Sequence, residues 1–403
     1  MSNNHSREMF EILDGQSRKA VIRVIGVGGG GCNTVNQMAM GGIDGVEFIC
    51  ANTDRDHLEK CLPTSQIQLG LELTRGLGAG SNPEIGRQAA EEDRDRIREM
   101  LEGTDLLFIT AGMGGGTGTG AAPVIAEVAK ELGILTVAVV TKPFAHENRK
   151  RLKVALEGIE QLRQRVDSLV LIPNEKLSLV LGSKITVMNC FKAANDVLNN
   201  AVQGISELIT RPGHINVDFA DVKTVMSNKG MAMMGIGRAS GEGRAQKAVE
   251  MALSSPLLDD IELSGARGLL VNVTCDESLE MEEWEFINQR VNDIASEEAD
   301  AKCGMAFNPE ANGEIWVTVV ATGLGEPRAA EMSHQAPAAP AMVNPRVAPF
   351  LRPPVEAMPM ESEPRHSYPQ KQVLRAAGGG SSFPIGLDDN VINIPAFLRN
   401  QAD

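Results

Sequence analysis

Short apolar runs alternate along the first half of the chain with stretches whose apolar residues recur at helical spacing. The runs are rich in β-branched residues, which predicts buried strands. They are Val21–Val27, Val46–Ala51, Leu106–Ala111, Leu135–Val140 and Leu169–Ile172. The helical stretches between them are Pro83–Leu101, Ala121–Glu131 and Arg149–Arg165. This alternation predicts a mostly parallel sheet with helices on both faces, an α/β fold with a Rossmann-like first domain.

A longer helical pattern separates this domain from a second one. Apolar residues keep helical spacing from Val187 to Ile209, and Arg211-Pro212-Gly213 ends the pattern. Strands and helices are again predicted beyond it, which indicates an α+β domain. The strand candidates are Gly230–Ile236, Leu269–Thr274 and Ile315–Ala321, and the helix candidates are Arg244–Leu253 and Met281–Ile294.

The two ends of the chain have a different composition. Residues 326–386 are rich in Pro, Ala and Gly, which predicts a disordered linker because such a segment cannot bury enough apolar surface to order itself. Val391, Ile394 and Leu398 then have the amphipathic spacing of a short peptide for a partner's groove. We therefore expect a flexible tail (1–20), a first domain (21–186), a central helix (187–211), a second domain (212–325), the linker and a partner-binding peptide (387–403).

Charge and cysteine content narrow the class of protein. The formal net charge is −15, from 38 basic and 53 acidic residues, which argues against nucleic-acid binding as the main role. Six cysteines lie far apart without a CxxC pair, so we expect a reducing compartment and neither a zinc site nor a disulfide framework. The N-terminus has no signal-peptide pattern, and the run Ile134–Val140 is too short to span a membrane. These features predict a soluble cytoplasmic protein.

The first of two glycine-rich loops lies between a predicted strand and a helix. Its sequence, Gly26-Val-Gly28-Gly29-Gly30-Gly31, satisfies the GxGxxG pattern of dinucleotide-binding sites. Asp54, at the end of the next strand, could then bind the ribose. From this loop alone, an NAD-type oxidoreductase remains an open alternative.

The second loop, Gly114-Gly115-Gly116-Thr117-Gly118-Thr119-Gly120, also joins a strand to a helix. Glycines let backbone N–H groups close around an anion, and the helix N-terminus adds its positive dipole end. Two such loops from one sheet suit the long anionic tail of a nucleoside triphosphate better than a dinucleotide. The sequence has no GxxxxGK[ST] motif, so the phosphates would depend on backbone donors rather than a loop lysine. A merely flexible glycine turn is the structural alternative.

GGGTGTG in this position resembles the signature of the tubulin and FtsZ superfamily. The resemblance extends over Val21–Leu324 and the terminal peptide, and it is closer to the bacterial branch than to eukaryotic tubulin. It implies a GTPase that uses GTP with Mg²⁺, the ion being carried by the nucleotide. Such a protein polymerises head-to-tail into the filaments of the bacterial division ring, in the cytoplasm at mid-cell. The implied partners are the chain itself, division regulators, and FtsA- and ZipA-like membrane-anchoring adaptors that bind Asp388–Asp403, without nucleic acid or membrane insertion.

The resemblance also assigns residues to the phosphates and the ribose. Phosphate contacts are implied for Gly29, Gly30, Gly31, Cys32, Asn33, Gly115, Gly116, Thr117 and Gly118. Ala79 and Gly80, in Gly78–Ser81, match the loop that senses the γ-phosphate, although this segment could equally be a plain turn. Glu147 and Arg151 match ribose and phosphate contacts. Their spacing of four residues would place them on one helix face, where an ordinary surface ion pair is the alternative.

Three residues on the central helix match the guanine-binding position of the family. The ring of Phe191 can stack on a base, and oxygen acceptors on Asn195 or Asp196 can bind the N1–H and 2-amino groups of guanine. Adenine has no donor at either place, so GTP is favoured over ATP. From spacing alone, Phe191 would be a core residue.

Asn216, Asp218 and Asp221 form an NxDxxD pattern just beyond the central helix. Their spacing alone fits a helix N-cap with an acid at the third position. The resemblance instead implies a catalytic role for Asp218 and Asp221, supported by Asn216, at the γ-phosphate of the next subunit. A non-hydrolysing scaffold of the same fold is the second alternative.

Overall fold

The computed structural model describes residues 19–324 except 64, 182–185, 212–214, 216, 229, 259–264 and 297–298. The expected N-terminal tail up to residue 18, the linker and the terminal peptide lie outside the described residues. All of the described residues belong to one compact unit. Its strands form a ten-stranded sheet with the order β3-β2-β1-β4-β5-β6-β7-β10-β8-β9.

The first six strands form the parallel part of the sheet. They are β1 (Ile22–Val27), β2 (Val46–Asn52), β3 (Ser65–Gln68), β4 (Leu106–Gly112), β5 (Leu135–Lys142) and β6 (Ser168–Pro173). Every neighbouring pair among them is parallel, which confirms the mostly parallel sheet. The strand order reverses between β1 and β4, and ligands of such sheets bind at the carboxyl ends of the strands beside this point.

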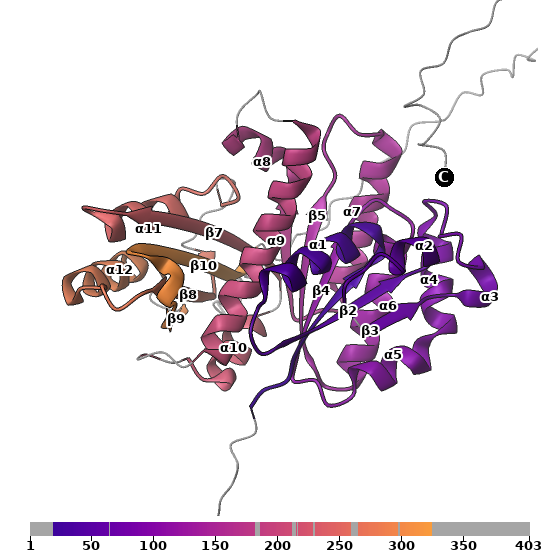
Figure 1. Ribbon diagram of the computed structural model, residues 1–403, viewed down its shortest axis with the longest axis horizontal. Coiled ribbons are helices and arrows are strands. Elements are labelled where there is room, and N and C mark those ends of the chain that lie inside the picture. The colour runs from indigo at the N-terminus through magenta and orange to yellow at the C-terminus, as the bar shows by residue number, and fades with distance from the viewer. Residues whose placement is uncertain are drawn as a thin grey trace, which may run out of the picture. The chain divides into compact units, whose positions relative to one another are not determined.

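Helices cover both faces of this sheet because its strands are apolar on both sides (Figure 1). Alternate residues of β1 point to opposite faces, so Val24 packs in the core with α1 (Gly28–Gly41) and α9 (Val187–Thr210), and Ile25 packs in the other core. The second core is closed by α4 (Pro83–Glu92), α5 (Arg94–Leu101), α6 (Thr117–Glu131) and α7 (Arg149–Arg163). The short helices α2 (Arg55–Leu58) and α3 (Leu71–Thr74) follow β2 and β3.

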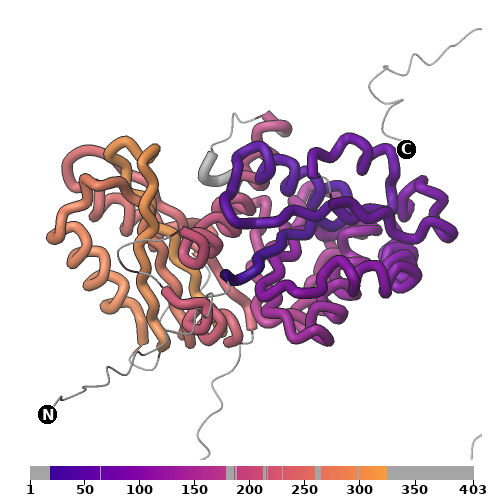
Figure 2. Tube along the Cα trace, turned by 60° about the horizontal axis from the view of Figure 1, so that its bottom comes forward, coloured from indigo at the N-terminus to yellow at the C-terminus, as the bar shows by residue number. Residues whose placement is uncertain are grey.

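The long helix α9 (Val187–Thr210) lies between the two halves of the chain, with α8 (Asn174–Leu181) near one end and α10 (Phe219–Met226) near the other (Figure 1). Its 24 residues span about 36 Å at 1.5 Å per residue. The prediction of a long helix is confirmed. Figure 2 shows the indigo-to-magenta half of the chain on one side of α9 and the orange half on the other. Among the described residues, no helix combines the length and apolarity that a membrane span requires.

The second half continues the same sheet. It comprises β7 (Met231–Ser240), α11 (Arg244–Leu253), β8 (Gly268–Cys275), α12 (Met281–Ile294), β9 (Asp300–Phe307), a 3₁₀ turn (Pro309–Ala311) and β10 (Glu314–Leu324). β10 runs antiparallel to both β7 and β8. The parallel pairing of Leu169 with Met231 and of Val170 with Ala232 joins the halves.

Two predicted helix boundaries are wrong. The helix predicted over Pro83–Leu101 is divided at Asp93, whose carboxylate accepts a hydrogen bond of 2.7 Å from the N–H of Gly70. The helix predicted from Ala121 begins at Thr117, so the last part of the second glycine loop is helical.

Candidate nucleotide-binding site

The two glycine loops meet at the carboxyl edge of the parallel sheet. β1 passes directly into α1 at Gly28, which has a φ of +70°. A Cβ atom on Gly28 would lie 2.8 Å from the nitrogen of Gly118, and one on Gly30 would lie 3.3 Å from Gly112. The loops are therefore in backbone contact, with no room for side chains. They place the N-termini of α1 and α6 side by side, which is an arrangement suited to anions.

The first turn of α6 supplies the donors of the second loop. The N–H groups of Thr117 and Gly118 belong to that first turn, where backbone donors have no partner within the helix. The threonine hydroxyls have partners inside the protein. Thr117 Oγ1 lies 2.7 Å from Thr53 Oγ1, and Thr119 Oγ1 accepts a hydrogen bond of 2.8 Å from the N–H of Gly114. The loop thus presents backbone N–H groups, and Gly115 faces open space.

Cys32 and Asn33 follow the first loop but point in different directions. The side chain of Cys32 is fully buried, and its Sγ lies 3.5 Å from the carbonyl oxygen of Gly26. Only the backbone of Cys32 can therefore contact a phosphate. The side chain of Asn33 reaches His57, with 3.1 Å between Oδ1 and Nε2.

The Gly78–Ser81 segment packs against the second loop. A Cβ atom on Gly116 would lie 2.9 Å from Cβ of Ala79 and 2.9 Å from the nitrogen of Asn82. Gly80 has a positive φ, as the turn requires, and Asn82 caps α4 by accepting a hydrogen bond from Glu84. The segment is a turn that packs against the second loop, so both interpretations remain open.

Glu147 and Arg151 form an ion pair beside the second loop, but not on one helix face as predicted. α7 begins at Arg149, because Asn148 caps it through a 2.9 Å hydrogen bond from Lys150, and Glu147 precedes the helix. Glu147 Oε2 lies 2.9 Å from Arg151 Nη1, and its other oxygen accepts from the N–H of Phe144. Arg151 also packs against Gly114.

The predicted base-binding residues lie on the first turns of α9, which pack against α1. Phe191 is 44% exposed and meets the ring of Phe144 edge-on at 5.7 Å, so it is not a core residue. Asn195 Oδ1 accepts a hydrogen bond of 3.0 Å from Thr34 Oγ1. The carboxylate of Asp196 accepts one from Gln37 Nε2. These bonds orient both acceptors from α1.

A cleft of about 490 Å³, including its open mouth, runs between these groups. Its lining includes Gly30, Gly112, Arg151, Phe191 and Asn195. Asn174 also lines it, although no sequence pattern pointed to this residue. The Asn174 side chain is 5% exposed, yet its Oδ1 is buried without a hydrogen-bond partner. Asn174 directly follows β6, and ligands of parallel sheets bind at the carboxyl ends of the strands. This position in the sequence could have indicated a role for Asn174 in the site.

The predicted catalytic acids lie near the amino ends of the strands, whereas the glycine loops lie at the carboxyl ends. Asp218 precedes α10 without making a side-chain capping bond, and it lines a cavity with Val21 and Ile22, where β1 begins. Asp221 Oδ1 lies 2.9 Å from Lys302 Nζ, and this bond raises the pKa of Lys302. Asn216 lies outside the described residues. The six residues of β1, about 20 Å at 3.3 Å each, separate this edge from the glycine loops.

Comparison with known proteins identifies the family. The profile of the tubulin/FtsZ family GTPase domain matches residues 21–182, and that of the FtsZ family C-terminal domain matches residues 230–325. The chain is 60% identical over 317 residues to the cell division protein FtsZ of Coxiella burnetii, which covers 79% of this chain and 82% of that protein. The chain belongs to the tubulin/FtsZ family.

A further relative and two solved structures are also similar to this chain. The cell division protein FtsZ of Pseudomonas aeruginosa is 52% identical over 405 residues, covering 98% of this chain and all of that protein. An FtsZ dimer from M. jannaschii superposes with a TM-score of 0.73 at 47% identity, covering 76% of this chain and 89% of that one. A protofilament of CetZ2 from Haloferax volcanii, at 21% identity and a TM-score of 0.62, shares the fold.

The tubulin/FtsZ assignment confirms the family resemblance and the fold class. The protein is therefore a GTPase, and the NAD-type oxidoreductase that the GxGxxG pattern left open is wrong. Within this family fold, Gly30, Glu147, Arg151, Phe191 and Asn195 of the predicted residues line one cleft, and the two glycine loops are in contact beside it. It places the predicted acids at the other end of the same sheet.

Proposed function

We propose that this FtsZ-family GTPase binds GTP in the cleft between α1, α6 and α9, and that a neighbouring subunit of its polymer supplies the acids that promote hydrolysis. The separation of Asp218 from the glycine loops by the length of β1 carries this proposal. An acid at one edge of the sheet cannot reach a phosphate at the other edge of the same chain. A head-to-tail contact brings the two edges of successive subunits together, and such contacts propagate into open filaments.

In this proposal the triphosphate lies along the two loops. The backbone N–H groups of Gly29, Gly30, Gly31, Cys32 and Asn33 face it on one side, and those of Gly115, Gly116, Thr117 and Gly118 face it on the other. Ala79 and Gly80 contact the γ-phosphate, since their turn packs on Gly116. Mg²⁺ carried by the nucleotide would supply positive charge that offsets the charge of the phosphates.

Base selection depends on acceptors held in place before the nucleotide arrives. Asn195 and Asp196 present oxygens that α1 already orients, and guanine offers N–H donors where adenine does not. Phe191 is exposed enough to stack on the base. Arg151 and Glu147 close the ribose side of the cleft.

Hydrolysis requires a water molecule aligned with the γ-phosphate. Two carboxylates three residues apart can accept hydrogen bonds from such a water and hold it for attack. We assign this role to Asp218 and Asp221, with Asn216 in support. Lys302 holds Asp221 in place through its 2.9 Å contact.

The biological role follows from the relatives. They are named cell division protein FtsZ, and the similarity to one of them extends over 98% of this chain. We infer that the filaments serve the bacterial division ring, in the cytoplasm at mid-cell. FtsA- and ZipA-like adaptors would attach them to the membrane through Asp388–Asp403, which lies outside the described residues.

Sedimentation with GTP, GDP or ATP, combined with phosphate release at several protein concentrations, tests this function. We expect polymers and phosphate release with GTP, and turnover per chain that is near zero in dilute protein and rises with concentration. Turnover independent of concentration would exclude a shared active site. Polymers without phosphate release would instead indicate a non-hydrolysing scaffold.

A further inference from the structure

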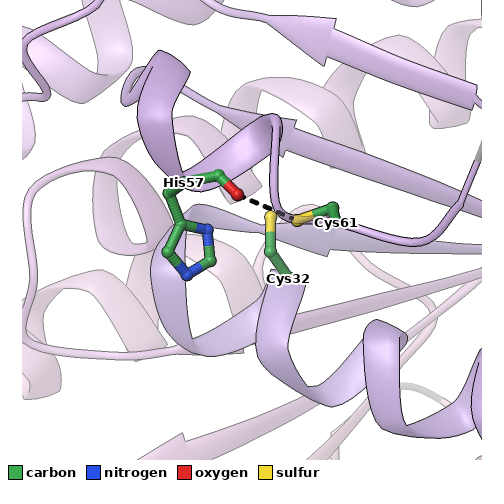
Figure 3. A group of neighbouring side chains, drawn as sticks. All are labelled: Cys32, His57 and Cys61. Atoms are coloured by element: carbon green, nitrogen blue, oxygen red, sulfur yellow. Dashed lines mark hydrogen bonds between the residues drawn. The ribbon is translucent and has the colours of Figure 1, made fainter.

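Two cysteines and a histidine gather behind the first glycine loop. Cys32 is on α1, His57 is on α2, and Cys61 follows α2. The ligand atoms of Cys32, His57 and Cys61 all lie within 4.8 Å of one another (Figure 3). Three groups that can bind a metal thus converge from α1, α2 and the segment after α2.

The orientation of His57 leaves one ring nitrogen available. Its Nε2 lies 3.1 Å from Asn33 Oδ1, and an amide oxygen only accepts hydrogen bonds. Nε2 therefore carries the proton, and Nδ1 has a free lone pair. Nδ1 is buried without a hydrogen-bond partner, and Figure 3 shows the ring beside the sulfurs of Cys32 and Cys61. A histidine that binds a metal through one nitrogen commonly donates its other N–H to an oxygen in this way.

The surroundings of the two sulfurs leave them free to bind a soft cation. Cys32 Sγ is 3.5 Å from the carbonyl oxygen of Gly26, and Cys61 Sγ is 3.3 Å from that of His57. These are weak thiol contacts, which a thiolate bound to a metal can give up. Sulfur and imidazole ligands select Zn²⁺ rather than the hard cation Mg²⁺, which prefers oxygen. The site is therefore chemically distinct from that of the nucleotide's Mg²⁺.

We propose that Cys32, His57 and Cys61 bind a Zn²⁺ ion. The sequence has no CxxC pair, and local spacing alone therefore argues against a zinc site. The fold supplies the ligands from separate elements instead, and the one local signal was the four-residue spacing of His57 and Cys61. The partly exposed side of His57 gives an ion a way in from solvent.

Metal titration of the full chain tests this site. The protein is reduced with a phosphine, treated with EDTA, freed of nucleotide, and titrated with Zn²⁺ against a chromophoric chelator. We expect about one tight Zn²⁺ per chain. Co²⁺ in its place should show thiolate-to-metal charge-transfer absorption.

Two variants and one control locate the ion. His57→Gln and Cys61→Ser should each weaken Zn²⁺ binding by about 100-fold or more, since loss of a supporting contact alone costs 10- to 100-fold. Cys303→Ser, a cysteine on β9 outside the cluster, should leave binding unchanged. The thermal unfolding midpoint checks that each variant is folded, and His57→Gln, at a partly exposed position, retains the fold even if Cys61→Ser does not.

Three results would overturn the proposal. The first is wild-type protein that takes up no Zn²⁺ in this competition. The second is equal Zn²⁺ binding by folded His57→Gln and wild type, which would indicate an adventitious surface ion. The third is Co²⁺ bound without the thiolate absorption. A Cys32–Cys61 disulfide in oxidised protein, together with no metal in reduced protein, would identify a redox pair instead.

Discussion

Gly28 and Gly118 are in direct backbone contact, and this contact joins the two phosphate loops. A Cβ atom on Gly28 would lie 2.8 Å from the nitrogen of Gly118, and the φ of Gly28 is +70°. Both the space and the backbone conformation therefore require glycine at this position. The contact holds the N-termini of α1 and α6 together, so it should matter for stability as well as for GTP binding.

Gly28→Ala should destabilise the protein by about 2–4 kcal/mol, because the left-handed backbone and the steric overlap each cost about 1–2 kcal/mol. Gly115→Ala is the matched control, since a Cβ atom there meets nothing within 4 Å. Urea unfolding of both variants measures the difference. Equal losses of stability would show that the Gly28 contact is not what holds the loops together.

Asp196→Ala should weaken GTP binding and narrow the preference over ATP. Loss of one hydrogen bond to a charged group is worth about 1.5–3 kcal/mol, or roughly 10- to 150-fold in affinity. Asn200→Ala is the control, because Asn200 lies one turn further along α9 and bonds to Arg238 instead. Calorimetry with GTP and ATP provides the measurement. Unchanged affinity and selectivity in Asp196→Ala would remove this residue from the base site.

The sheet was predictable because its strands are long, apolar and followed by glycine or helix signals. β3 and β9 were missed for the opposite reason. Ser65–Gln68 is four residues long and three of them are polar, and Asp300–Phe307 contains a charged pair and a glycine. Such segments become strands through their neighbours β2 and β8 rather than through their own pattern.

The site was predictable where backbone chemistry defines it, as in the glycine loops. It was less predictable where side chains from distant segments meet. Lys302, which pairs with Asp221, lies on β9, a strand that the sequence pattern did not reveal. Asn174 enters the cleft only because β6 ends beside it, and the start of α7 at Arg149 depends on the cap provided by Asn148.

Truncation after Gly386 should leave GTPase activity and sedimentation with GTP unchanged. All of the described site residues lie between Gly28 and Lys302, so the truncation removes none of them. Binding to purified FtsA- or ZipA-like adaptors should be lost. Surface-bound adaptor exposed to full-length and truncated protein measures this. A truncated chain that still binds adaptors normally would show that another segment recruits them.

Asp221→Ala should bind GTP with normal affinity but hydrolyse it about 100-fold more slowly or worse, because it loses a water-orienting carboxylate. The change also frees Lys302, which lies 2.9 Å from Asp221. Lys302→Ala is therefore the control, since it breaks the same ion pair and keeps the carboxylate. We expect a much smaller loss of activity in Lys302→Ala. Equal losses would assign the effect to the ion pair.

Mixing Asp221→Ala with a variant whose pocket is blocked, Thr117→Arg, tests whether the acids act on a neighbour. Thr117 is 9% exposed and begins α6 in the second loop, so an arginine there obstructs the phosphates. In an equal mixture with random order, about one contact in four joins an intact pocket to an intact acid pair. Hydrolysis should therefore return to about a quarter of the wild-type rate, provided that the blocked variant co-sediments with the filaments. If it does co-sediment and the mixture stays inactive, the acids act within their own chain, and the distance across β1 must close in some other way.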